Sequence, residues 1–382
     1  MPVYVSDSAG VVAELIAQFG HRPATSAAEA MAAAQINARL RQAGFSVATH
    51  SLPATAHPGK RFTPVATALM VAIGLAVWQP LVGAALGLWL MALVLVDGVY
   101  APLPSLRQQS MSQNIIAVRP IEIANNQAPT QPRWRLVLLA PLDTPPVWQG
   151  LARLIAPSFE GLLARLALGS LPLAIATGAI VWPALRWPLT FASFASAWLF
   201  FWISRRQLPL RQPDGGIAAL ATLIITGQNI PRLQHVEVWA VAVGAAHCDH
   251  SGIKTLIARY PFDPANTLII GLGSLAYGQL AIMSRHGIFR HETADPLLYR
   301  LAIAADRADP GIDLEPHSQA ARDELLSPLR QRGFRTLKIC AVPNGDTTLN
   351  PLLSERAARL IIAIACLLDA ETNDDLSILR AE

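Results

Sequence analysis

Three long stretches of this chain carry no charged residue, and they constrain its fold more than any other feature. They run from Phe62 to Val96, from Leu166 to Leu185 and from Trp187 to Ser204. A helix that spans a bilayer needs about 20 mostly apolar residues, with roughly 17 as the lower limit. The second and third stretches therefore each predict one spanning helix, with Arg186 in the tight turn between them.

The first stretch is too long for one spanning helix and short for two. Pro80 lies near its middle, where a proline can end one helix and begin the next. We expect a hairpin of two short helices, Thr63–Trp78 and Leu81–Val99. The alternative is one long helix that is kinked at Pro80.

Basic residues near the ends of these segments predict their orientation, because Lys and Arg are enriched on the cytoplasmic side of a membrane. One side, shared with both termini, holds Lys60, Arg61, Arg107, Arg153, Arg165, Arg205, Arg206 and Arg211, and only Arg186 lies in a turn on the far side. We therefore expect a multi-pass protein of the inner cell membrane that contacts membrane lipid. Its polar domain and both termini are predicted to face the cytoplasm.

Residues 147–165 differ from these apolar stretches. Trp148, Leu151, Leu154, Ile155, Leu162 and Leu163 recur at helical spacing, with charged residues between them. The pattern predicts an amphipathic helix at the membrane surface. A core-packing helix is the alternative.

Charged residues make up 15% of the 382 residues, and the formal net charge is +4. The low charge excludes a disordered chain, and the small net charge gives no reason to expect nucleic acid as a partner. The cysteines, Cys248, Cys340 and Cys366, are odd in number and widely spaced, so no disulfide framework is expected.

The remaining residues alternate between helix and strand patterns. Ser26 and Glu29 have the spacing of a helix capping box. Strands are expected at 45–50, 114–118, 134–142, 236–243, 267–271 and 336–342, and helices at 216–226, 252–260, 296–307, 318–332 and 352–368. Such alternation predicts an α/β fold with a mostly parallel central sheet flanked by helices, plus four inserted transmembrane helices.

The predicted organisation interrupts one α/β domain twice. Residues 1–61 and 100–146 form its N-terminal part, and residues 205–382 form its C-terminal part. Between them lie a transmembrane hairpin at 62–99, the interfacial helix at 147–165 and a second hairpin at 166–204.

The order of these segments resembles the two-zinc aminopeptidase and glutamate carboxypeptidase family, the zinc-dependent exopeptidases. The resembling motifs are Gly20–Ser26, Asn114–Ala117, Leu138–Thr144, Gly216–Leu220, Val238–Ile253 and the stretch from Asp346 to Leu368. The resemblance covers nearly all of the chain outside the apolar stretches. It implies a phosphorylase/hydrolase-like α/β fold and, in an intact family member, a peptidase that uses two zinc ions.

Most of the zinc ligands that the resemblance implies are missing. The first histidine ligand falls on Pro141, the glutamate pair on Ala246 and His247, and a later aspartate near Gly273. Asp143 matches the aspartate that would orient the first histidine. The bridging aspartate falls on Arg211 or Gln212, and Asp214 matches it only if two residues are deleted.

We therefore expect no catalytic residues and a vestigial cleft around Asp143, Asp214 and His247, with no cofactor. A rebuilt zinc site that uses Asp143, Asp214, His247, Asp249 and His250 is the alternative, since these are residue types that bind zinc. The favoured function is a catalytically inactive binding or assembly module. A metal-dependent peptidase or hydrolase, or an accessory subunit that contacts other membrane protein subunits, are alternatives. The sequence does not identify a small-molecule or peptide ligand.

Overall fold

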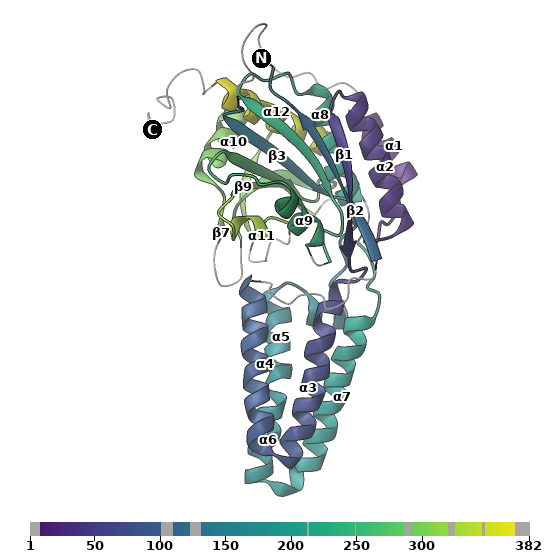
Figure 1. Cartoon of the computed structure of the whole chain (residues 1–382), viewed down its shortest axis with the longest axis vertical. Helices are drawn as coiled ribbons and strands as arrows, with labels where there is room; N and C mark the ends of the chain where they lie inside the picture. The colour runs from purple at the N-terminus through teal and green to yellow at the C-terminus, as the bar shows by residue number, and fades with distance from the viewer. Residues whose placement is uncertain are drawn as a thin grey trace.

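The computed structural model describes residues 8–100, 110–122, 131–211, 214–248, 250–286, 292–319, 325–345 and 348–370. The molecule is elongated and has two parts. An α/β domain contains one large sheet, and a stem of helices projects from one end of it (Figure 1). We call these parts the domain and the stem.

The domain is built around a mixed sheet, which corrects the expectation of a mostly parallel one. Its described strands are β1 (Ser46–Ala54), β2 (Ser110–Arg119), β3 (Trp134–Pro141), β4 (Val236–Val243), β5 (Thr267–Leu272), β6 (Gln279–His286), β7 (Glu292–Thr293), β8 (Glu315–Gln319) and β9 (Arg335–Val342). The order is β1-β2-β4-β3-β5-β9-β6-β7, with β8 paired to β6. The central strands β4, β3, β5 and β9 are parallel to one another, and β8 is parallel to β6. The pairs β1–β2, β2–β4, β6–β9 and β6–β7 are antiparallel.

Alternating side chains of the central strands pack on opposite faces of this sheet. On β3, Leu136, Leu138 and Ala140 join one buried cluster, whereas Val137 and Leu139 join another. The first cluster includes residues of α1 (Ser8–Gln18), α2 (Ala27–Gln42), α8 (Asp214–Asn229), α10 (Pro296–Ala308) and α12 (Leu352–Ala370), and the second those of α9 (Ser251–Arg259) and α11 (Ser327–Arg330). Both faces are covered, as continuous apolar strands require.

The predicted helix at 318–332 is wrong. Ser318 and Gln319 end strand β8, and only Ser327–Arg330 is helical among the described residues of that range. Pro328 in that range can occupy only the first turn of a helix without breaking it. The strands β6, β7 and β8 were not predicted, because β6 gains its place by pairing with distant β8 and β9.

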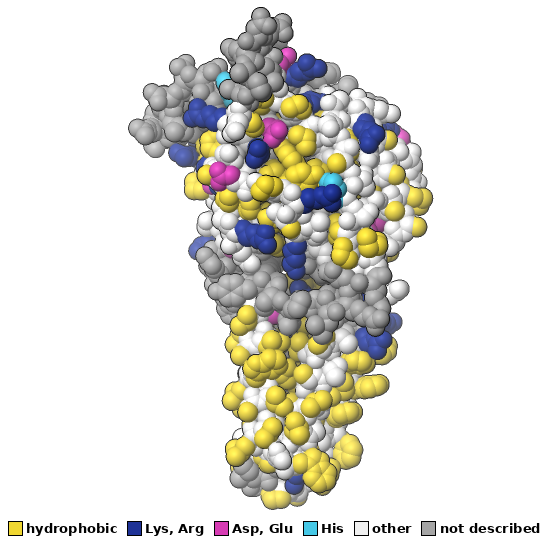
Figure 2. Space-filling view, viewed as in Figure 1, with side chains coloured by type: hydrophobic (Ala, Val, Ile, Leu, Met, Phe, Trp, Pro, Cys, Tyr) yellow, Lys and Arg dark blue, Asp and Glu magenta, His cyan; other side chains and the backbone are white. Residues whose placement is uncertain are grey.

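The stem consists of α3 (Thr63–Trp78), α4 (Pro80–Tyr100), α5 (Phe159–Gly169), α6 (Leu171–Val181) and α7 (Arg186–Arg205). Helices α3 and α4 meet at Gln79 and pack against each other, which confirms the predicted hairpin over a single kinked helix. Figure 2 shows apolar side chains over much of the visible face of the stem. Large apolar residues exposed on the stem helices include Leu81, Trp89, Phe191 and Trp198. Within the described residues, three helical stretches, Pro58–Trp78, Pro80–Gly98 and Phe159–Gly178, are long and apolar enough to cross a membrane. The fourth spanning helix that was predicted, at 187–204 in α7, is not among them.

The predicted interfacial helix at 147–165 is also wrong. A short 3₁₀ helix at Gly150–Ile155 is followed by Pro157, and Ser158 then caps α5 by accepting a hydrogen bond from the Gly161 amide at 3.2 Å. The latter half of the predicted helix therefore begins the stem. A proline near this position ends the first element, and a serine N-cap starts the second.

Buried Arg165 of α5 ties together the end of the stem that adjoins the domain. Its Nη1 donates to the carbonyl oxygens of Leu154 (2.9 Å) and Ala156 (3.0 Å), and its guanidinium lies 4.8 Å from the centre of the Phe62 ring. Phe62 ends the 3₁₀ helix Pro58–Phe62 that leads into α3. The two hairpins are thus joined where they enter the domain.

Close packing at Gly83 gives a test of the hairpin. A Cβ on Gly83 of α4 would lie 2.3 Å from the Ala76 Cα of α3, whereas a Cβ on Gly74 would meet no atom within 4 Å. We expect Gly83→Ala to lower the free energy of unfolding by about 1–3 kcal/mol, because the helices must separate. Thermal unfolding in detergent measures this, with Gly74→Ala as the matched control. Equal melting temperatures for the two variants would contradict the packing of α3 against α4.

Candidate functional site: a hydrogen-bonded loop at the sheet edge

The residues that match the family's zinc ligands follow three adjacent parallel strands. Pro141 ends β3, Ala246 and His247 follow β4, and Gly273 follows β5. Because β4 and β5 both pair parallel with β3, the carboxyl ends of these strands meet at one edge of the sheet. This is the edge where open α/β sheets bind their ligands.

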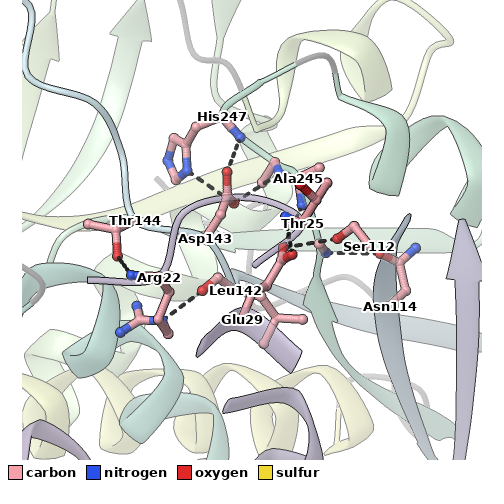
Figure 3. Close-up of polar contacts among 12 residues, drawn as sticks. Arg22, Thr25, Glu29, Ser112, Asn114, Leu142, Asp143, Thr144, Ala245 and His247 are labelled. Carbon is pink, nitrogen blue, oxygen red and sulfur yellow. Dashed lines mark hydrogen bonds and ion pairs between the residues drawn. The ribbon is translucent and has the colours of Figure 1, made fainter. Parts of the chain in front are cut away.

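Asp143 holds the loop that follows β4. It is 1% exposed, and its two carboxylate oxygens accept hydrogen bonds from the amides of Ala246 and His247, both at 2.9 Å. The His247 Nδ1 atom lies 3.3 Å from Asp143 Oδ1. Burial alone would raise the pKa of Asp143, but the His247 side chain and the two amides outweigh it and hold that pKa below its usual value. Figure 3 shows these contacts.

Four consecutive amides of this loop, those of residues 244–247, donate hydrogen bonds to side-chain oxygens. The Gly244 amide donates to Asn114 Oδ1 and the Ala245 amide donates to Glu29 Oε1, each at 3.0 Å. Ala245 adopts a positive φ of 47°, a backbone conformation that non-glycine residues rarely adopt. Side-chain oxygens from α2, β2 and the end of β3 therefore satisfy the amides of residues 244–247 in place of backbone partners.

Glu29 is the second buried carboxylate of this network. It is 1% exposed and also accepts hydrogen bonds from the Thr25 amide (2.6 Å) and the Ser112 hydroxyl (2.9 Å). Burial is the largest cause that raises the pKa of Glu29, to about 7, and the nearby Asp143 carboxylate raises it further. The Ser26 hydroxyl caps α2 by accepting from the Glu29 amide, as the capping-box spacing predicts, but the Glu29 carboxylate reaches Thr25 instead of Ser26.

Arg22 supplies positive charge near both carboxylates. Its side chain is fully buried, and its Nε donates to the Leu142 carbonyl oxygen at 2.8 Å. Burial lowers the pKa of Arg22 to about 10, while Asp143 and Glu29 act in the opposite direction. The Arg22 Nη2 atom lies 3.0 Å from where a Cβ on Gly216 would be, so the guanidinium packs on the first turn of α8.

The residues at these positions do not fit a pair of zinc ions. Pro141 and Ala246 offer no side-chain ligand atom, and Ala246 is buried. At Gly273 a Cβ would lie 2.9 Å from the Cys340 Cβ, so a carboxylate side chain has no room without a shift of β9. Within the described ranges, no group of three or more His, Cys, Asp or Glu side chains is placed to hold a metal ion.

The structure brings together only part of the predicted ligand set. Asp143 and His247 are in contact, as stated above. His250 is buried and occupies the position before α9, with a φ of 57°. Asp249 and the side chain of Asp214 lie outside the described residues, so their part in a rebuilt site is still a prediction.

The sequence analysis missed Arg22, Ser112 and Asn114 as parts of the network, and it treated Glu29 only as a capping residue. Their common property is a buried polar side chain, which for Ser112 and Asn114 lies against the loop and for Arg22 lies beside Leu142 and Asp143. They come from two segments, β2 and the stretch before α2, that are far from the loop in sequence, so no local pattern indicates their role in the network. The only signals were that Arg22 and Asn114 fall within two of the motifs that carry the family resemblance.

The comparisons with solved structures agree with this geometry. The chain is similar to a zinc aminopeptidase from Bacillus subtilis (10% identity, 98% of this chain and 97% of that one, TM-score 0.53). It is also similar to an aminopeptidase from Aneurinibacillus sp. strain AM-1 (11% identity, 96% and 94%, TM-score 0.52). An Acidobacteriales bacterium glutaminyl cyclase matches as well (13% identity, 97% and 96%, TM-score 0.51).

This chain has the zinc-exopeptidase fold. No protein-family model matches the sequence, and no curated protein sequence matches it. At identities of 7–13%, the similarity establishes the fold and leaves the activity open. The resemblance that was read from the motifs is thereby confirmed at the level of the fold.

The raised pKa of Glu29 predicts a pH dependence of stability. Between pH 4.5 and about 7 the folded state retains a proton on Glu29 that the unfolded chain has released. The free energy of unfolding therefore falls as pH rises through this window, by about 3 kcal/mol for a shift of this size. We expect Glu29→Gln to remove that contribution, measured as melting temperature against pH.

Exposed Glu315 on β8 provides the control, because Glu315→Gln changes a carboxylate in solvent. Its melting curve should follow the wild-type pH dependence. A Glu29→Gln variant that also follows the wild-type slope would contradict the protonated, buried state of Glu29.

Proposed function

We propose that this protein is a membrane-anchored, non-catalytic relative of the zinc exopeptidases that acts as a binding or assembly module at the cytoplasmic face of the inner membrane. The observation that carries the proposal is the network around residues 244–247. It occupies the edge of the sheet where a two-zinc site would lie, and its carboxylates accept hydrogen bonds from backbone amides.

The donor chemistry supports the loss of catalysis. Two-zinc hydrolysis needs ligands that hold both ions and a base that activates water. Pro141, Ala246 and Gly273 stand at positions that the resemblance assigns to a ligand, the base and another ligand. Removing groups of this kind costs many powers of ten in rate, because each acts on the reacting atoms directly.

The stem supports membrane anchoring. Its exposed surface is rich in large apolar side chains, including Leu81 (86% exposed) and Phe191 (71% exposed), which are costly in water. Lys60, Arg61, Arg205 and Arg206 lie where α3 and α7 adjoin the domain, and Arg186 lies at the opposite end of α7. This asymmetry favours a cytoplasmic domain.

An accessory role in a larger membrane complex is a second candidate, and helix α7 favours it. It exposes Phe191, Trp198 and Trp202, and it is less apolar than the three helical stretches that could cross a membrane. Its serines and tryptophans suit contact with another protein helix as well as with lipid. A monodisperse monomer after purification from native membranes in mild detergent would count against this role.

Metal content and activity test the proposal directly. We expect the full chain, purified in detergent and equilibrated with zinc, to retain substoichiometric zinc by mass spectrometry of the metal. We expect no release of amino acids from aminoacyl substrates and no cyclisation of N-terminal glutamine. His247→Ala should have the same metal content as the wild type.

Two results would contradict this proposal. Two zinc ions per chain together with aminopeptidase activity would show that the protein is an ordinary two-zinc peptidase. One metal ion per wild-type chain that is lost in His247→Ala would instead favour the rebuilt site around Asp143 and His247.

A further inference from the structure

Helix α7 carries a row of exposed aromatic side chains that ends in a basic residue. Phe194, Trp198, Trp202 and Arg206 are spaced four residues apart, so they follow one another along one face of the helix. The three aromatic side chains are 45%, 56% and 46% exposed, and Arg206 is exposed as well. We call these three rings the aromatic stripe. An exposed apolar surface that leads directly to a positive charge suits a ligand with an apolar part and an anionic part.

Both arginines at the end of α7 lie over aromatic rings. The guanidinium carbon of Arg206 is 4.9 Å from the centre of the Trp202 ring, and that of Arg205 is 5.5 Å from the centre of the Phe201 ring. Phe201 in turn stacks on Trp198, with ring centres 5.7 Å apart. These cation–π contacts hold the exposed guanidinium groups at the border of the aromatic stripe, where an anion can reach them.

Lys60 and Arg61 lie at the same level of the stem as these arginines. Helices α3 and α7 pack against each other, and the hydroxyl groups of Thr63 and Ser204 are 3.2 Å apart in a hydrogen bond. A Cβ on Gly59 would lie 2.6 Å from the Ser204 carbonyl oxygen, so the segment before α3 packs on the end of α7. Four basic residues therefore gather where the apolar stem meets the domain.

The acidic side chains of the stem leave this positive charge in place. The described stem helices contain two acidic residues. Glu160 pairs with Arg153 at 3.6 Å, and Asp97 is buried near Arg165. In the described part of the chain, no ion pair joins the four basic residues to an acidic side chain. Their charge therefore favours an anionic partner.

We propose that this surface binds an anionic phospholipid, with its phosphate group at Arg205, Arg206 and Lys60 and one acyl chain along the aromatic stripe. This inference rests on the proposed membrane anchoring. Guanidinium groups match the oxygens of a phosphate group, and basic clusters beside a spanning helix attract anionic lipids. A soluble anion would contact only the cations, and an apolar protein helix only the stripe, whereas a phospholipid contacts both.

Native mass spectrometry of the full chain in detergent, titrated with equal amounts of phosphatidylglycerol and phosphatidylcholine of different mass, tests the proposal. We expect one phosphatidylglycerol per wild-type chain, bound in preference to phosphatidylcholine. The double variant Arg205→Gln/Arg206→Gln should weaken phosphatidylglycerol binding about tenfold or more, because each basic residue near a lipid surface contributes severalfold. The double variant Arg205→Lys/Arg206→Lys should keep most of the preference, because the positive charge remains.

Arg41→Gln/Arg232→Gln is the matched control for the loss of two positive charges. Both residues are exposed and lie away from the stem, since Arg41 precedes the start of β1 and Arg232 precedes the start of β4. This variant should bind phosphatidylglycerol as the wild type does. Equal binding of the two lipids by the wild type would overturn the proposal without any variant. An unchanged preference in Arg205→Gln/Arg206→Gln would overturn it as well.

Two further readings of the same experiment test other occupants of this surface. We expect a lipid-bound monomer from which glycerol phosphate does not displace the lipid. Displacement by glycerol phosphate at equal concentration would overturn the role of the aromatic stripe. A dimer of the chain without bound lipid would overturn the assignment of this face of α7 to a phospholipid.

A membrane wash separates this inference from the function on which it rests. We expect the wild type and all variants to remain in the membrane fraction after carbonate extraction, because the apolar surface of the stem is unchanged. Release of the wild-type chain by this wash would overturn the membrane anchoring itself. Retention in the membrane with no preference for phosphatidylglycerol would overturn only the further inference.

Discussion

The carboxylate of Asp143 determines the arrangement of the whole sheet edge. It accepts the amides of Ala246 and His247, and Glu29 accepts the neighbouring amide of Ala245. Two buried carboxylates this close repel each other, and the structure compensates with Arg22 and with the hydrogen bonds that both carboxylates accept. A partly satisfied polar network in this position would be costly, which explains why residues from several distant elements converge on one short loop.

This loop also connects the site to the stem. His247 contacts Asp143 and at the same time lines a cavity of about 370 Å³, which is also lined by His57 and Pro58 before α3 and by Leu208 after α7. The segments that enter and leave the second hairpin pair with each other, since the Val147 amide donates to the Pro209 carbonyl oxygen and the Arg211 amide donates to that of Pro145. The edge of the sheet therefore has helical insertions directly beside it.

Much of the fold was predictable because its signals are local. Short apolar runs indicated the central strands, and Pro80 indicated the turn of the first hairpin, so these elements were placed within a few residues. The strands β6 and β8 were missed because distant pairing partners, and not local pattern, make them strands. The prediction of an interfacial helix at 147–165 was wrong because Pro157 and Ser158 divide a segment whose apolar residues recur at helical spacing.

The candidate site was predictable only where it matched family positions. Pro141, Ala246 and Gly273 could be assigned from the motifs, and so could Asp143 and His247. The replacement network could not, because Glu29 acquires its role through a loop 216 residues away in the chain, and Arg22 through burial against Leu142, 120 residues away. Burial of a charged side chain follows from tertiary packing, which no short motif records.

Hydrogen–deuterium exchange at the amides of residues 244–247 tests most directly whether side-chain oxygens, and not a metal ion, hold this loop. The measurement compares the full chain in detergent before and after treatment with a chelator. The account predicts slow exchange at these amides that the chelator leaves unchanged, because Asn114, Glu29 and Asp143 accept their hydrogen bonds. Fast exchange that appears only after the metal has been removed would contradict it.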